Sequence, residues 1–284
     1  MTEIPDNPYD LGALRKDNDF SEVVPRKKKT SLTKIIQEWL NRRTVLIVPH
    51  LNYELSFISP PIGPGRYKKV ANLIHQTELA KPTAAETISL CYEAYQKGQS
   101  EFLEVRDILK NKMSWLDLLR FLSPVPLPPS SKSYLLLWMF TGNLYSPRGG
   151  AYIQDDPPII NKRISMTKSE LVKKLELSDT SVRFISPGYK TGELTPSEIA
   201  KHPYIKGLAT QEGAEKLAEL VKDHFKEFHL LGPRNFDNEI VRVSALRSRF
   251  KKLYLDCACF GWAPGYAFGI DKPARQTRQE RTTC

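Results

Sequence analysis

The C-terminal part of the chain contains the segment Asn238-Glu-Ile-Val-Arg-Val-Ser-Ala-Leu-Arg-Ser-Arg-Phe-Lys-Lys-Leu-Tyr-Leu-Asp-Cys-Ala-Cys-Phe-Gly-Trp-Ala-Pro-Gly-Tyr-Ala-Phe-Gly-Ile270. Its beginning is apolar and strand-like, with Ile240, Val241, Val243, Ala245 and Leu246. Further on, Leu253 and Leu255 alternate with Tyr254 and Asp256, which predicts a strand that is buried on one face. The last six residues, 265–270, predict a terminal strand whose glycines allow close approach of backbone or rings. Between Asp256 and Pro264 no period is present, so regular strands frame an irregular connection.

Composition limits the classes of protein to which the chain can belong. At 284 residues, 40% of them hydrophobic, it forms either one large domain or two small ones with a substantial core. It has no apolar run of about 18 residues and no secretory signal peptide, so we expect no membrane insertion and a cytoplasmic location by default. Display at the cell surface by another route remains compatible with this. Four cysteines in a chain of this length do not predict a disulfide framework.

The N-terminal half is expected to be mostly helical. Residues 1–30 predict a flexible charged arm that ends in the basic run Arg26–Lys29. A mostly helical region follows over 31–130, either as a separate unit or as part of the same domain. In it we expect a strand over 44–48 that Pro49 ends, a partner strand over 53–58, and a turning connection over Pro60–Gly65. The expected helices are 31–40, 67–79, 84–97, 101–110 and 115–122, and a proline-rich linker covers 123–131.

The second half mixes strands with helices. Strands are predicted over 134–140, 149–154 and 181–186, and an amphipathic helix over 212–228. Thr167 with Glu170 has the spacing of a capping box, and Thr195-Pro-Ser-Glu198 predicts a second helix start with proline in the first turn. This order of elements predicts an α+β domain over 131–272, followed by a basic tail over 273–284.

Catalytic and metal-binding patterns are weak, so we expect no enzyme, no cofactor and no bound metal. None of the five histidines forms a metalloprotease pair, and no nucleophile elbow or phosphate-binding loop of the Walker type is present. Cys257 and Cys259 would share one face of a strand and bind a soft metal only with two further ligands, which no spacing supplies. Asp155-Asp156 offers calcium-binding carboxylates, although the adjacent Pro157-Pro158 also fits a simple turn.

A family resemblance is carried by Arg242-Val-x-Ala-Leu-x-Ser248, Leu253-x-Leu255 and Gly265-Tyr-Ala-Phe-Gly-Ile270. These residues resemble the terminal segment of variable proteins diversified by diversity-generating retroelements, of the archaeal and candidate-phylum type. The resemblance is concentrated in 240–270 and extends loosely to 181–188 and 213–228. It implies a C-type lectin fold, here with an N-terminal helical extension or insertion. It also implies a display scaffold whose variable codons are rewritten by reverse transcription.

The resemblance implies a non-enzymatic function in which outward residues of the terminal segment recognise an unknown macromolecule, with protein as the first choice. The displayed set would be Ser244, Arg247, Arg249, Phe250, Tyr254, Asp256, Cys257, Ala258, Cys259, Phe260, Trp262, Ala263 and Pro264. On this view the two cysteines are products of diversification. The alternative is a basic nucleic-acid-binding protein that uses Arg26–Lys29 and the helical region 66–122, because the net charge is +10. Dispersed solvated lysines explain the same charge.

Overall fold

The computed structural model describes residues 41, 43–110, 135–147, 149–161, 163–233 and 236–271. The predicted arm (1–30), two predicted helices (31–40 and 115–122), the linker (123–131) and the basic tail (273–284) lie outside these residues. The described part has mixed helix and strand content, as the α+β prediction requires. Its helices are α2 (Tyr67–Gln76), α3 (Ala84–Gln96), the 3-10 helix η2 (Ser100–Phe102), α4 (Leu103–Leu109), α6 (Lys168–Glu176), α7 (Pro196–Lys201) and α8 (Pro203–His224). Its strands are β1 (Thr44–His50), β2 (Tyr53–Gly65), β3 (Leu136–Tyr145), β4 (Ala151–Asp155), β5 (Ile159–Ile160), β6 (Arg163–Ile164), β7 (Val182–Ile185), β8 (Gly192–Glu193), β9 (Glu227–Leu231), β10 (Ile240–Arg249), β11 (Lys252–Cys259) and β12 (Gly265–Ile270).

A ten-stranded sheet organises the described residues. Its order is β1-β2-β12-β3-β10-β11-β9-β8, and β4 and β7 extend from β3 as a branch. One edge of β3 pairs with β10, while the other edge pairs first with β12 and then with β4. Every residue of β3 is buried, which agrees with the apolar run at its start, and the buried polar residues Thr141 and Asn143 follow that run. β1 and β2 therefore belong to the same sheet as the strands of the second half.

The proline-containing strands differ from the sequence expectation. Pro49 does not end the first strand, because β1 is an edge strand on which an exposed proline needs no hydrogen-bonding partner for its missing N–H. The segment Pro60–Gly65 is not a turning connection but the second half of β2. Its pairing with β12 is irregular, with aligned residues at Gly65 and Ile62 and register shifts around them. Such an irregular ladder accommodates prolines because it does not use every backbone N–H.

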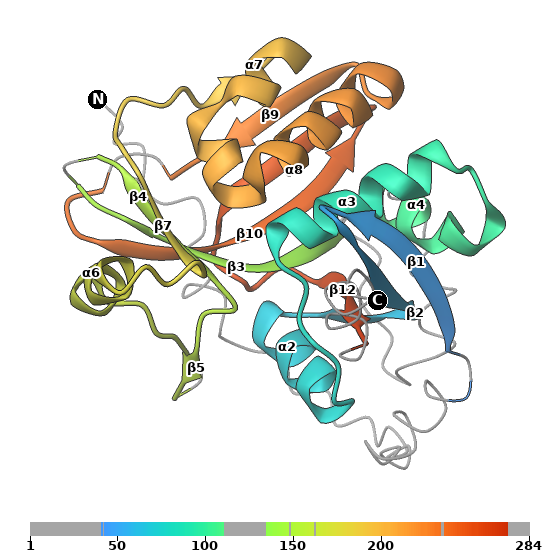
Figure 1. Cartoon of the computed structure of the whole chain (residues 1–284), viewed down its shortest axis with the longest axis horizontal. Coiled ribbons are helices and arrows are strands. Elements are labelled where there is room, and N and C mark those ends of the chain that lie inside the picture. The colour runs from blue at the N-terminus through green and yellow to red at the C-terminus, as the bar shows by residue number, and fades with distance from the viewer. Residues whose placement is uncertain are drawn as a thin grey trace, which may run out of the picture.

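Helices cover the two faces of the sheet unequally. Residues of α3 and α8 pack with inward residues of β1, β3, β9 and β11 in one large apolar cluster. On the opposite face, α2 packs against Trp138, Phe140, Val243, Ala245 and Ala267 in a second cluster. In Figure 1, α8 lies over β9 and β10, whereas α2 lies beside β2. The cluster under α2 includes residues of β2, β12, β3 and the first half of β10, so the far end of β10 and the strands β11, β9 and β8 are left partly exposed on that side.

Helix caps follow the predicted spacing, and one boundary was missed. The Thr167 hydroxyl accepts a hydrogen bond from the Glu170 N–H, and Thr195 and Glu198 form a complete capping box. The helix predicted from Glu212 is the second part of α8, which begins after a kink at Thr210 (φ 69°, ψ 174°). The prediction that this helix reaches Phe228 is wrong, because Phe225 is already extended and 227–231 form β9 with alternating burial.

The described helices also bear on membrane insertion. None of the helices in the described part of the chain combines the length and the apolar character that crossing a membrane requires.

Candidate binding surface

The exposed face of β10 and β11 carries a row of stacked polar side chains. Arg247 pairs with Tyr254 across the two strands, and its guanidinium carbon lies 4.6 Å from the Tyr254 ring centroid. On its other side, Tyr254 stacks on His229 of β9, with ring centroids 5.2 Å apart and an interplanar angle of 17°. The Arg247 Nε also lies 3.6 Å from a carboxylate oxygen of Asp256. These contacts hold the row in one arrangement on a rigid sheet, with Leu253 and Leu255 fully buried beneath it.

The turn between β10 and β11 presents an exposed aromatic ring among basic residues. Phe250 is 78% exposed, and the Arg249 guanidinium carbon lies 4.7 Å from its ring centroid. Phe250 and Lys251 both have positive φ, 52° and 63°, as a two-residue turn of the primed type requires. Side chains other than glycine, asparagine and aspartate rarely adopt this conformation, so the turn sequence is not optimised for stability.

The connection between β11 and β12 forms a second aromatic group. Phe260 is 61% exposed and Trp262 is 72% exposed, and their ring centroids are 5.4 Å apart. The Arg242 guanidinium carbon lies 3.9 Å from the Phe260 ring centroid. Gly261, at φ +75°, anchors the connection, because its carbonyl accepts a hydrogen bond of 3.1 Å from the Tyr67 N–H. The aromatic rings are therefore exposed although the backbone beneath them is fixed.

We call the outward side chains of this region the terminal surface. It comprises Arg242, Arg247, Arg249, Phe250, Tyr254, Asp256, Phe260 and Trp262. The two aromatic groups lie at opposite ends of β11, which are separated by roughly 23 Å at about 3.3 Å per residue. The stacked row with Tyr254 lies between them along β11. Arg242 alternates with Val243 of the cluster under α2, so it points to the opposite face of the sheet from Arg247.

The structure places the thirteen residues of the predicted displayed set at different depths. Exposed members are Arg249, Phe250, Phe260, Trp262 and Ala263, and partly buried members are Arg247, Tyr254, Asp256, Ala258, Cys259 and Pro264. Ser244 and Cys257 are fully buried, so the prediction that they face the surface is wrong. Ligand binding by the other eleven remains a prediction.

A buried hydrogen-bond network explains why Ser244 and Cys257 are inside. The Asn143 side-chain amide donates to the Ser244 hydroxyl over 2.8 Å, and Tyr204 donates to the Asn143 amide oxygen over 2.8 Å. The Tyr145 hydroxyl donates to the backbone carbonyl of Cys257 over 3.0 Å and lies 2.6 Å from the Tyr204 hydroxyl. Polar groups that are buried in this way must remain paired, so Ser244 belongs to the frame of the fold.

The two cysteines do not share a face. Cys257 packs in the large cluster next to α3 and α8, whereas Cys259 packs against the cluster under α2. The reason is a bulge: three residue steps in β11, from Asp256 to Cys259, oppose only two in β10, from Val243 to Ala245. Burial also raises the pKa of Cys257 to about 12, so its thiol stays protonated at neutral pH. The arrangement does not form the paired soft-metal ligands that simple alternation suggests.

Asp155 and Asp156 already have basic partners. The Arg183 guanidinium donates to both carboxylate oxygens of Asp155, over 2.7 and 2.8 Å. Asp156 forms an ion pair with Lys81. These carboxylates are therefore used inside the fold in a way that does not favour the calcium alternative.

A serine-histidine contact is present but inaccessible. The Ser89 hydroxyl lies 2.9 Å from His50 Nδ1 and accepts a hydrogen bond of 3.1 Å from Lys216 Nζ. Ser89 is 1% exposed and His50 4% exposed, so no substrate reaches the hydroxyl in this conformation. We interpret the contact as a structural link between β1, α3 and α8.

Sequence reasoning missed several residues next to the terminal surface. Glu227 was assigned to the helix predicted over 212–228, and neither His229 nor Glu193 was assigned to any element. Their meeting on β8 and β9 was therefore not expected. The alternation Glu227-Phe-His-Leu-Leu231, with its buried second and fourth residues, is the signal that indicates the strand. Hydrogen bonds from Lys252 and His229 hold the pKa of Glu227 below its usual value, so this exposed-face carboxylate is ionised at neutral pH.

Comparisons with known proteins give little further information. No family model matches the chain, and no curated protein matches it. A solved structure, from work on the accommodation of massive sequence variation in Nanoarchaeota by the C-type lectin fold, is similar with 13% identity and a TM-score of 0.41. The alignment covers 82% of this chain and 100% of that chain. Both the identity and the TM-score are low, so this likeness does not by itself assign the chain to that fold, which remains a prediction.

Proposed function

We propose that this chain is a non-enzymatic binding protein that recognises a macromolecule, in the first place a protein, through the terminal surface. The observation that carries the proposal is the exposure of three large aromatic side chains within 13 residues of sequence. Phe250, Phe260 and Trp262 are 78%, 61% and 72% exposed. Exposed aromatic rings beside arginines, as at each end of β11, are typical of protein-binding surfaces, where such residues supply much of the binding energy.

The geometry around these rings supports binding rather than incidental exposure. The Arg242 guanidinium over Phe260, and the stack of Arg247, Tyr254 and His229, fix side chains that would otherwise lose rotamer freedom on binding. Preorganisation of this kind lowers the entropic cost of association. Aromatic rings add large contact areas with few rotatable bonds, as they do in antibody combining sites.

The proposal includes a C-type lectin-like scaffold whose terminal segment is diversified by a retroelement. Its support is the sequence resemblance over 240–270, together with the separation of buried frame residues from exposed positions in the same segment. The genomic test is direct. The DNA near the gene should contain a near-copy of the codons for about 240–270, differing at adenines, together with a reverse-transcriptase gene. Absence of both removes the retroelement part of the proposal and leaves the binding part to be tested by itself.

Site-specific photo-crosslinking tests the binding part. A photoreactive residue at position 262 is expected to capture one macromolecule reproducibly from the native host, and Phe250→Ala in the same chain is expected to reduce that capture. The matched control carries the photoreactive residue at position 177, because Leu177 is 81% exposed but lies at the end of α6. Equal capture at both positions, or no effect of Phe250→Ala, would contradict the proposal. The nucleic-acid alternative remains a prediction, and salt-dependent binding to DNA or RNA is its test.

A further inference from the structure

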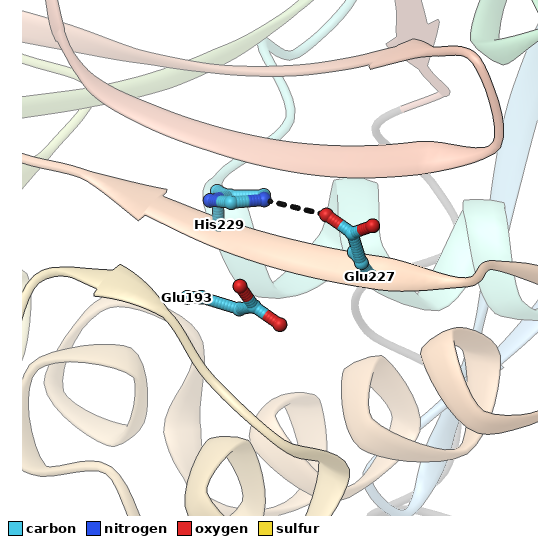
Figure 2. A group of neighbouring side chains, drawn as sticks. All are labelled: Glu193, Glu227 and His229. Carbon is cyan, nitrogen blue, oxygen red and sulfur yellow. Dashed lines mark hydrogen bonds and ion pairs between the residues drawn. The ribbon is translucent and has the colours of Figure 1, made fainter.

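Three side chains that commonly bind metals meet beside the terminal surface. They are Glu193 of β8 and Glu227 and His229 of β9, and Figure 2 shows them grouped on the two neighbouring strands. One ligand atom from each lies within 4.8 Å of the other two. Glu193 is directly opposite His229 in the antiparallel pairing, and Glu227 precedes His229 by two residues and so shares its face. The backbone ladder, rather than a loop, therefore brings these side chains together.

The spacing of the ligand atoms fits a small metal ion. His229 Nε2 and an oxygen of Glu227 are 3.2 Å apart. In a tetrahedral zinc site with bonds of about 2.0–2.1 Å, neighbouring ligand atoms are separated by about 3.3 Å. The Glu193 carboxylate is exposed and makes no hydrogen bond or ion pair with another described side chain, although it interacts electrostatically with Lys252. It is therefore able to rotate towards the other two ligands.

The group already holds a positive charge. The ammonium of Lys252, on the neighbouring strand β11, forms an ion pair with Glu227. Two carboxylates next to this single ammonium leave a negative excess that favours a further cation. The same ammonium competes with any ion that binds Glu227, which gives the site a testable property.

We propose that Glu193, Glu227 and His229 bind a divalent transition-metal ion, zinc first. One imidazole and two carboxylates suit zinc and its neighbours better than calcium, which prefers oxygen ligands alone. Three protein ligands leave a fourth position for water or for a group of a bound partner. His229 also stacks on Tyr254, so the ion would fix one side of the stacked row in the terminal surface. The metal proposal does not depend on the proposed binding function.

Titration calorimetry of the tag-free full chain with zinc chloride, after treatment with a chelator, tests the proposal. We expect one zinc ion per chain at this site. Glu193→Gln, Glu227→Gln and His229→Ala are each expected to weaken its binding at least tenfold. Glu198→Gln is the matched control, because Glu198 is a capping carboxylate on α7 outside this group, and it should leave zinc affinity unchanged.

Lys252→Gln distinguishes a metal site from a purely structural group of side chains more clearly than the ligand variants do. Removal of the competing ammonium is expected to strengthen zinc binding several-fold, whereas a merely structural role of the group predicts no gain. Cys259→Ser should change nothing, which separates this site from thiol binding. The proposal is overturned if wild-type chain binds no zinc at micromolar concentrations. It is equally overturned if the three ligand variants bind zinc as tightly as the wild type does.

Discussion

Two consecutive segments near the end of the described chain, Phe260–Pro264 and β12, differ sharply in what surrounds them. All six residues of β12 are buried between β2 and β3, and Phe268 is 1% exposed. In the preceding segment Phe260 is 61% exposed and Trp262 is 72% exposed. Side chains of similar size therefore stabilise the fold in one segment and face solvent in the other. The comparison shows that apolar residues near the C-terminus have two separate roles. In β12, which has a neighbouring strand on both edges, they fill the core, whereas in Phe260–Pro264, which lies outside the sheet, they face solvent.

The largest expected change in the free energy of unfolding comes from Phe268, and Phe260 is its matched comparison. Phe268→Ala removes a ring from the core and is expected to lower the free energy of unfolding by about 3–5 kcal/mol. Phe260→Ala removes only a partly exposed ring and its contact with Arg242, at a cost of about 1 kcal/mol or less. Urea unfolding followed by circular dichroism measures both. Similar losses for the two variants would show that the contrast between the segments is wrong.

Substitution of Gly265, the first residue of β12, is expected to give the next largest loss of folding stability. A Cβ at Gly265 would lie 2.6 Å from Trp138 Nε1 and 2.7 Å from the carbonyl oxygen of Leu136. Because one of these atoms belongs to the backbone, Gly265→Ala is expected to cost about 1–3 kcal/mol. Ala263→Leu, two residues earlier at an exposed position, should change unfolding by less than about 0.5 kcal/mol. A tolerated Gly265→Ala would contradict the close packing of β12.

Substitution of Ser244 tests which residues of the segment 240–270 stabilise the fold and which are free to vary. Ser244→Ala leaves the Asn143 amide without its buried acceptor and is expected to cost about 1–3 kcal/mol. Arg249→Ala, on the same strand but exposed, should stay within about 0.5 kcal/mol of wild type in the same unfolding measurement. If Ser244→Ala proves neutral, Ser244 regains its place among positions that are free to vary.

The smallest expected effect on stability belongs to Trp262. Trp262→Ala should leave the free energy of unfolding within about 0.5 kcal/mol of wild type, because the ring is largely exposed and the backbone anchor at Gly261 remains. In a chain that carries the photoreactive residue at position 250, the same substitution should reduce capture of the partner at least several-fold. A variant that unfolds easily yet captures normally would reverse the roles assigned to the two segments.

Much of the frame follows from sequence periodicity. Leu253 and Leu255 predict the buried side of β11, and residues 265–270 predict β12, because alternation and small residues directly report strand burial. The N-caps at Thr167 and Thr195 are confirmed for a similar reason, since a cap depends on residues only three positions apart. Local patterns were sufficient wherever local contacts determine the structure.

The deviations arise where distant segments decide the outcome. The orientation of Cys259 depends on a bulge between β10 and β11, and burial of Ser244 depends on Asn143 in β3. Pro60–Gly65 lie in a strand because β12, some 200 residues later in sequence, pairs with them. The group of Glu193, Glu227 and His229 likewise requires β8 and β9 to be neighbours. None of these pairings has a signature within a single window of sequence.

The position of β12 has a consequence for synthesis of the protein. Every other described strand precedes β12 in the chain, yet β12 lies in the interior of the sheet between β2 and β3. During synthesis, β2 and β3 are therefore made long before β12, the strand with which both of them pair. A product that stops before Gly265 lacks an interior strand rather than an edge strand. Such a truncated product exposes two unpaired strand edges and apolar surface, which are features that chaperones and proteases recognise. A complete sheet therefore forms only when translation continues in frame through β12, which follows the irregular connection between Asp256 and Pro264.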